Sequence, residues 1–148
     1  MPATRTEARD QVLDLITVAA VAAGIPAARI VYDDKAGRKP DLDDPVVLPW
    51  MRVLFRHAAS AQRSLTGDLG RSRFVRGATL TVQIFTASGD GLTSADAVSA
   101  ALLASVEGKR TAGGCQFFEA TANGFGPEGP WFYTLMTARV EYDEFVTT

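Results

Sequence analysis

Residues 77–108 constrain the fold most, because they have the pattern of a buried strand, a glycine turn and a helix. Every second residue from 78 to 84 is apolar, and the residues between them are polar or β-branched. That period of two predicts a strand with one buried face. Phe85 falls on the polar side, which indicates that the second face is also partly covered. Residues 87–91 then suit a tight reversal of the chain.

A helix is expected after this turn, with Thr93 as its N-cap and Asp96 in an acidic variant of the capping box. Apolar residues recur at helical spacing and give the helix one buried stripe: Ala95, Val98, Leu102 and Val106. Gly108 suits the position just after the helix. This unit explains folding, but it carries no obvious catalytic chemistry.

A first helix is expected from the capping pair Thr4 and Glu7 to about Ala23, where Gly24 and Pro26 end it. Further segments are expected as strands: residues 30–32, 50–56, 115–122 and 131–142. Between them we expect an exposed loop at 33–45, a long hairpin or a loop that orders on assembly at 58–73, and a turn at 123–130. The pattern predicts one α+β domain over residues 1–148, with a mainly antiparallel sheet, two helices packed on one face and long exposed loops.

Composition excludes several classes of function. The formal net charge of −2 at pH 7 argues against general affinity for nucleic acid. The single cysteine, Cys115, rules out an internal disulfide and a multi-cysteine zinc site, and it fits a reducing compartment such as the cytoplasm. No apolar run approaches the roughly 18 residues of a membrane span, so no membrane contact is expected.

Few residues suggest catalysis, and no catalytic, metal-binding or cofactor-binding residue is predicted. His57 is the only histidine, and no nucleophile motif accompanies it. Cys115 has no neighbour in sequence that would activate the thiol. Asp90 would repel a phosphate at the turn before the second helix. An enzyme or small-ligand-binding domain would have to be built around Cys115, His57 and Asp90, and it stays open as an alternative.

Charge is concentrated in two segments. Within residues 52–76, six arginines stand against one acid, Asp68: Arg52, Arg56, Arg63, Arg71, Arg73 and Arg76. Acids gather near the C-terminal end: Glu141, Asp143 and Glu144. Because arginine is enriched at interfaces and pairs with carboxylates, these residues are the candidate subunit or partner interface. The alternative for both segments is a solvated surface.

The order of these segments resembles a known family. It consists of the N-terminal helix, the strands Trp-Met-Arg-Val-Leu-Phe (50–55) and Arg-Phe-Val-Arg-Gly-Ala-Thr-Leu-Thr-Val-Gln-Ile-Phe (73–85), the glycine turn 89–91 before the second helix, and the aromatic turn and strand at 129–144. This pattern is similar to the small tail terminator, or tail-completion, proteins of long-tailed bacteriophages and gene transfer agents. The resemblance covers about residues 6–145.

The resemblance implies a structural virion protein rather than an enzyme. A homohexameric ring would sit at the head-proximal end of the tail, terminate polymerisation of the tail tube and join the head-tail connector or neck protein. DNA would pass through the ring lumen without sequence-specific binding, and assembly would take place in the host cytoplasm. Each subunit of a ring offers two different patches to its neighbours. We therefore expect the arginine segment and the acidic end to complement each other between subunits.

Within virion assembly, one alternative is another small neck or head-closure protein, or a tail-tube subunit. Such proteins can share a small α+β architecture. The charged loops at residues 33–44 and 60–70 would suit contacts with tube or connector in either case.

Overall fold

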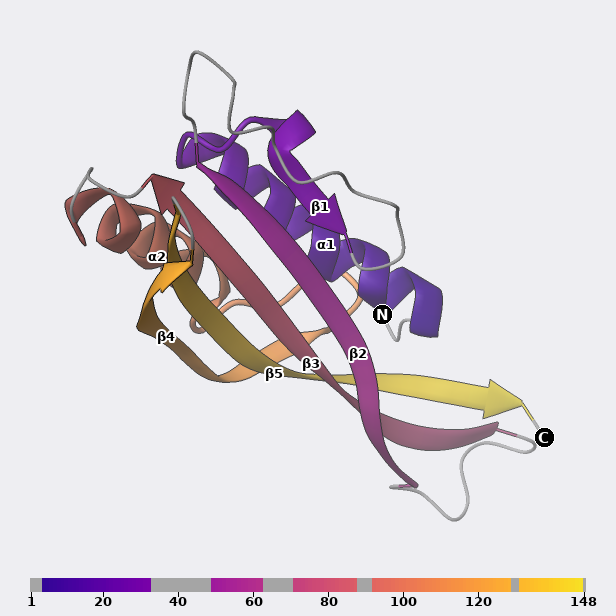
Figure 1. Ribbon diagram of the computed structural model, residues 1–148. Coiled ribbons are helices and arrows are strands. Elements are labelled where there is room, and N and C mark those ends of the chain that lie inside the picture. The colour runs from indigo at the N-terminus through magenta and orange to yellow at the C-terminus, as the bar shows by residue number, and fades with distance from the viewer. Residues whose placement is uncertain (1–3, 33–48, 63–70, 88–91, 129–130, 148) are drawn as a thin grey trace.

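The computed structural model describes residues 4–32, 49–62, 71–87, 92–128 and 131–147. Its elements follow in chain order (Figure 1): helix α1 (Arg5–Ala22), a 3-10 turn (Ala27–Arg29), strands β1 (Ile30–Tyr32), β2 (Trp50–Gln62) and β3 (Arg71–Ala87), helix α2 (Leu92–Val106), and strands β4 (Gln116–Glu128) and β5 (Trp131–Thr147). The strands form a five-stranded sheet in the order β1-β2-β3-β5-β4. Neighbouring strands are antiparallel except for β1 and β2, which are parallel.

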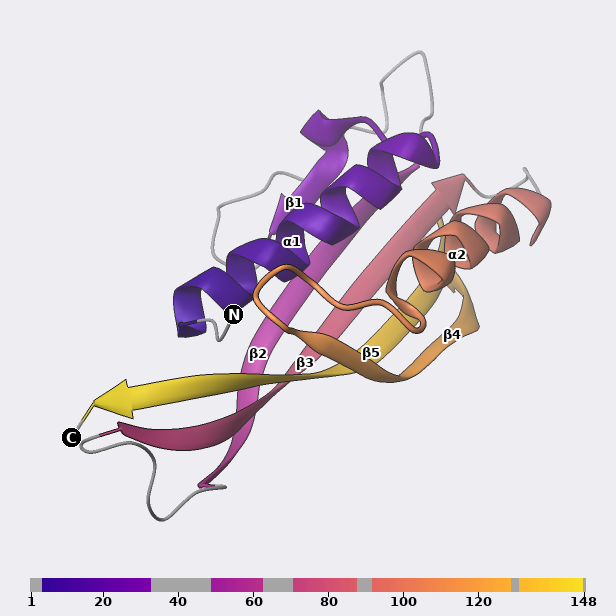
Figure 2. The same cartoon turned by 180° about the vertical axis from the view of Figure 1, so that it is seen from behind.

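Both helices cover the same face of the sheet, as Figure 1 and the reverse view in Figure 2 show. The core lies between the helices and the sheet. Alternate residues of the strands point into it, in agreement with the predicted period of two. In β3 the inward residues are at most 1% exposed: Ala78, Leu80, Val82 and Ile84. The expected α+β class and the placement of both helices on one face are therefore confirmed.

Helix α1 begins and ends as the sequence predicts. The Thr4 side chain accepts a hydrogen bond from the Glu7 amide, and the Glu7 carboxylate accepts one from the Thr4 amide. Gly24 ends the helix with a φ of 101°, which favours glycine. The buried residues of the helix are Ala8, Val12, Ile16 and Ala20. The contact line therefore follows a strict spacing of four residues.

Helix α2 begins at Leu92, so Thr93 lies within its first turn and the predicted N-cap is wrong. Leucine is a good helix former, and the helix starts before the hydroxyl residue. The apolar stripe of α2 is buried as predicted, from Ala95 to Val106. Gly108 follows the helix with a φ of 66°.

The turn predicted at residues 123–130 is wrong for residues 123–128, and residues 129–130 lie outside the described residues. Strand β4 continues to Glu128, and β5 begins at Trp131. The glycines in this region accompany a register shift between Gly124 and Gly126, where Gly126 has a φ of 110°. Glycine in a strand often marks such an irregularity, so these residues bend the strand without ending it.

Strands β3 and β5 form a long ribbon that extends beyond the helices (Figures 1 and 2). They pair without a register shift from Arg71 opposite Thr147 to Ala87 opposite Trp131. Strand β2 joins β3 as the hairpin that was one of the two expected alternatives, with Gln62 opposite Phe74. We call residues 60–62, 71–77 and 141–147 the arm. The expected loop at 33–45, and residues 63–70 of the segment expected as a hairpin or loop, lie outside the described residues.

Candidate interaction surface

The predicted interface residues fall on two parts of the sheet. Arg52 and Arg56 lie on β2, on the face away from the helices, which we call the open face. The other described candidates lie on the arm: Arg73, Arg76, Glu141, Asp143 and Glu144. Arg63 and the side chain of Arg71 lie outside the described residues. The fold therefore brings the arginine segment and the acidic end together on adjacent strands.

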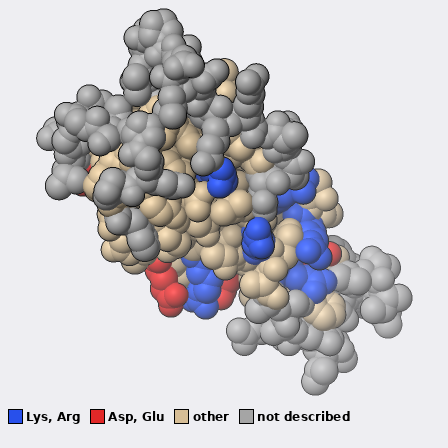
Figure 3. Space-filling view, viewed as in Figure 1, with Lys and Arg blue, Asp and Glu red and all other residues tan. Residues whose placement is uncertain are grey.

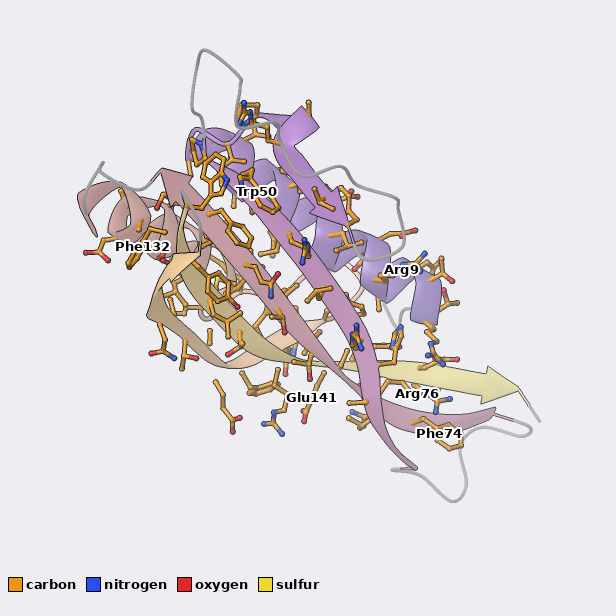
Figure 4. The ribbon with its side chains drawn as sticks, in the orientation of Figure 1. Arg9, Trp50, Phe74, Arg76, Phe132 and Glu141 are labelled. Atoms are coloured by element: carbon orange, nitrogen blue, oxygen red, sulfur yellow. The ribbon has the colours of Figure 1, made fainter. Side chains whose placement is uncertain are left out.

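Two ion pairs connect the strands of the arm. Nη2 of Arg73 lies 2.7 Å from Oδ2 of Asp143, and Nε of Arg76 lies 3.4 Å from Oε2 of Glu144. The two pairs lie on opposite faces of the arm, because successive residues of a strand alternate. The Arg76 guanidinium also covers the Phe74 ring, 4.7 Å from its centroid (Figure 4). The charge complementarity that was expected between subunits thus exists within one chain. A contact between subunits stays a prediction.

The open face carries basic, acidic and uncharged side chains, and Arg139 on β5 lies 3.3 Å from Oε1 of Glu141 and 4.0 Å from Oε1 of Glu119. Arg52 donates from Nη1 to Oε1 of Gln83 over 3.4 Å, and its guanidinium lies 5.8 Å from the Trp50 ring centroid. In Figure 3, basic side chains are scattered across this face among uncharged residues, and acidic side chains lie beside basic ones at its lower edge. Such a surface suits polar contact with another macromolecule.

Aromatic side chains cover the end of the open face that lies away from the arm. Trp50 stacks on Phe85 with ring centroids 4.0 Å apart, and Trp131 meets Trp50 edge-on at 6.2 Å. These three residues are 1%, 3% and 7% exposed. The expected partial covering of the second face is therefore confirmed. Nε1 of Trp50 is buried without a hydrogen-bond partner among the described residues.

A polar cleft of about 340 Å³ lies where the arm leaves the body. Arg5 lines it from α1, His57 from β2, and Arg76, Tyr142 and Glu144 from the arm. The Tyr142 hydroxyl lies 3.4 Å from Nδ1 of His57. Burial lowers the pKa of His57 below its ordinary value, and Arg5 and Arg9 lower it further, whereas Glu144 opposes them. The imidazole is therefore neutral at pH 7.

The two described residues considered for catalysis, Cys115 and His57, do not share an open site. Cys115 is 0% exposed within the main core, and burial raises the pKa of its thiol. A protonated, buried thiol is a poor nucleophile. His57 lines the cleft at the arm, and Asp90 lies outside the described residues. Across the described ranges, no group of three His, Cys, Asp or Glu side chains could hold a metal ion.

Phe145, which is 40% exposed on the arm, was not among the predicted interface residues. It lines a notch of about 400 Å³ together with Arg73, Arg110 and Asp143. The prediction ended the last strand at residue 142, so this aromatic residue fell outside it. The alternation of polar and apolar residues breaks at Glu144 and Phe145, so the sequence pattern gave no signal that the strand continues.

Comparisons with known proteins support the fold alone. No protein-family model matches the sequence, and no curated protein matches it. Sixteen solved chains match the structure. One of them, which carries an identifier in place of a descriptive name, has a TM-score of 0.61 and 18% identity, over 95% of this chain and 96% of its own. In the described part of the protein, no helix is long and apolar enough to cross a membrane.

Proposed function

We propose that the protein is a structural virion protein of the tail terminator type. It forms a hexameric ring at the head-proximal end of a phage-type tail, stops polymerisation of the tail tube and offers the joining surface for the neck or connector. The observation that carries this proposal is the arm, which extends beyond the helix-covered body. A narrow ribbon of strands buries little of its own surface and is only marginally stable alone in water, so it suits contact with another protein.

The charges of the arm and the open face have separate roles in this proposal. The ion pairs Arg73–Asp143 and Arg76–Glu144 neutralise the arm, so its contacts depend on shape and on backbone groups. Arg52 and Arg56 lie on the open face and offer donors to carboxylates of a neighbouring subunit or of the tube. DNA passes through the ring without being read in sequence.

Imaging of particles made without the protein tests this function. We expect overlong or headless tails, because polymerisation of the tube is then not stopped and the neck has no joining surface. Supplying the intact protein in the same cells is the control and restores tails of one length. A complete loss of tails would indicate a tube subunit instead, and normal tails would contradict a role in the tail.

A further inference from the structure

The exposed strand edges of the described sheet differ in how well they can accept another strand. Strand β1 pairs over only three residues, Ile30 to Tyr32. Strand β4 has two register shifts along its length, and β2 has one between His57 and Ser60. Short edges and bulged edges are poor templates for strand addition. The last part of β5 has neither feature, because its pairing with β3 is regular to Thr147.

Among the described residues, β4 does not pair with β5 beyond Glu141. The pairing with β4 begins at Gln116 opposite Glu141, so residues 142–147 pair only with β3 within the described residues. The notch of about 400 Å³ lies beside this edge, between the arm and the loop that carries Arg110 and Gly113. The edge therefore has regular backbone geometry and space beside it.

We propose that residues 143–147 of β5 pair antiparallel with the same residues of a second copy, around a two-fold axis at Phe145. Antiparallel pairing places the two bodies at opposite ends of the joined arms. If β5 of the second copy ran parallel, its earlier residues would occupy the position of β4. Strand β4 pairs with this side of β5 up to Glu141. The steric arrangement therefore favours the two-fold contact.

Charge selects the register of this pairing. With the axis at Phe145, Asp143 lies opposite position 147 and Glu144 opposite position 146, which are uncharged. An axis at Glu144 would place two carboxylates directly opposite each other, which is destabilising. Arg73 and Arg76 also neutralise the two acids from the neighbouring strand.

In this register, the Phe145 side chain gains a contact with its counterpart in the second copy. Residues directly opposite each other in an antiparallel pair point to the same face, with Cβ atoms about 4.5–5.5 Å apart. The Phe145 ring, which is 40% exposed in one copy, therefore meets its counterpart across the axis. Aromatic cross-strand pairs stabilise a sheet.

This contact goes beyond the proposed ring. A two-fold contact uses the same patch on both copies and closes after two, whereas a ring needs two different patches. The dimer is thus a property of the free protein, and its two arms must separate before they contact a neighbouring subunit of the ring or the tail tube. The two proposals fail in different experiments.

The first test measures the dimer dissociation constant of the full chain by sedimentation equilibrium without tail tubes. Phe145→Glu places two carboxylates across the axis, and we expect the constant to rise about tenfold or more. Thr79→Glu is the matched control, since it adds the same charge to an exposed position of the open face on β3, away from the free edge. It should leave the constant unchanged, and circular dichroism checks that both variants fold.

The second test is oxidative cross-linking of Phe145→Cys, with Thr79→Cys as control. Cysteines that face each other across the axis should form a disulfide between copies, which a non-reducing gel shows as a dimer. Cys115 is fully buried and does not compete. A monomer at all concentrations, a dimer unaffected by Phe145→Glu, or a dimer that is not cross-linked in the Phe145→Cys variant would each overturn the proposal.

Discussion

Arg73 and Asp143 form the shortest ion pair of the described residues, yet both side chains are partly exposed to water. Their exposed fractions are 47% and 38%. Exposed pairs contribute little to stability, because water and salt screen them and both side chains lose freedom. On the arm, the pair therefore serves mainly to neutralise the two charges and to orient the two side chains.

A double-mutant cycle with Arg73→Ala and Asp143→Ala should give a coupling energy of about 0.2–1 kcal/mol in the free energy of unfolding. The coupling should fall when salt is raised, because added ions screen the pair. Denaturant unfolding of the four proteins measures it. A coupling well above this range, insensitive to salt, would show that the arm is more enclosed than the structure describes.

His57 makes stability depend on pH near neutrality. Its pKa in the folded protein is lowered by burial and by Arg5 and Arg9. The unfolded chain therefore binds more protons between the folded value and the ordinary value of about 6.5. The contribution of His57 to the free energy of unfolding should be fully present above about pH 6.5, and the free energy should fall as the pH drops below that value.

His57→Gln should weaken this dependence, because glutamine does not titrate. Chemical denaturation of both proteins between about pH 5 and 8 gives the two slopes. The carboxylates titrate in both proteins, so the difference between the slopes isolates the histidine. Equal slopes would contradict the lowered pKa.

The elements are held together partly by one side chain of α1. Oε1 of Gln11 accepts hydrogen bonds from Oγ1 of Thr111 over 2.7 Å and from the Gly113 amide over 2.8 Å. Oγ1 of Thr111 in turn accepts from the Cys115 amide over 3.0 Å. Gln11 thus fixes the loop between α2 and β4 from a helix that is distant in sequence.

Gln11→Ala should lower the free energy of unfolding by about 1–3 kcal/mol, because the Gly113 amide and the Thr111 hydroxyl lose their acceptor. Asp14→Ala, on the exposed side of the same helix, is the control and should change it by about 0.5 kcal/mol or less. Thermal and denaturant unfolding provide both values. Equal effects of the two changes would mean that water replaces Gln11 without loss.

Local sequence patterns predicted the elements well where one rule acts alone. The capping pair of α1 and the alternation in β3 depend on a few neighbouring residues. The region around Gly124 and Gly126 was predicted wrongly, because glycine serves both turns and strand irregularities. Only pairing with β5 makes these residues part of a strand.

For the whole molecule, the fold class was predictable and the arm was not. The number and order of elements determine an α+β sheet with both helices on one face. The arm depends on where β4 begins relative to β5. That position is a register between strands, and it cannot be read from either segment alone. The pairing of Arg73 with Asp143 follows from that register, so it too required the structure.

The central claim is that copies of this chain form a ring on a tail tube. Light scattering across a concentration series, with and without purified tail tubes, followed by electron microscopy of the same samples, tests it most directly. We predict a hexameric ring with a central hole, either alone or at one end of the tubes. A protein that remains monomeric or dimeric and ignores tail tubes at every concentration would contradict the claim.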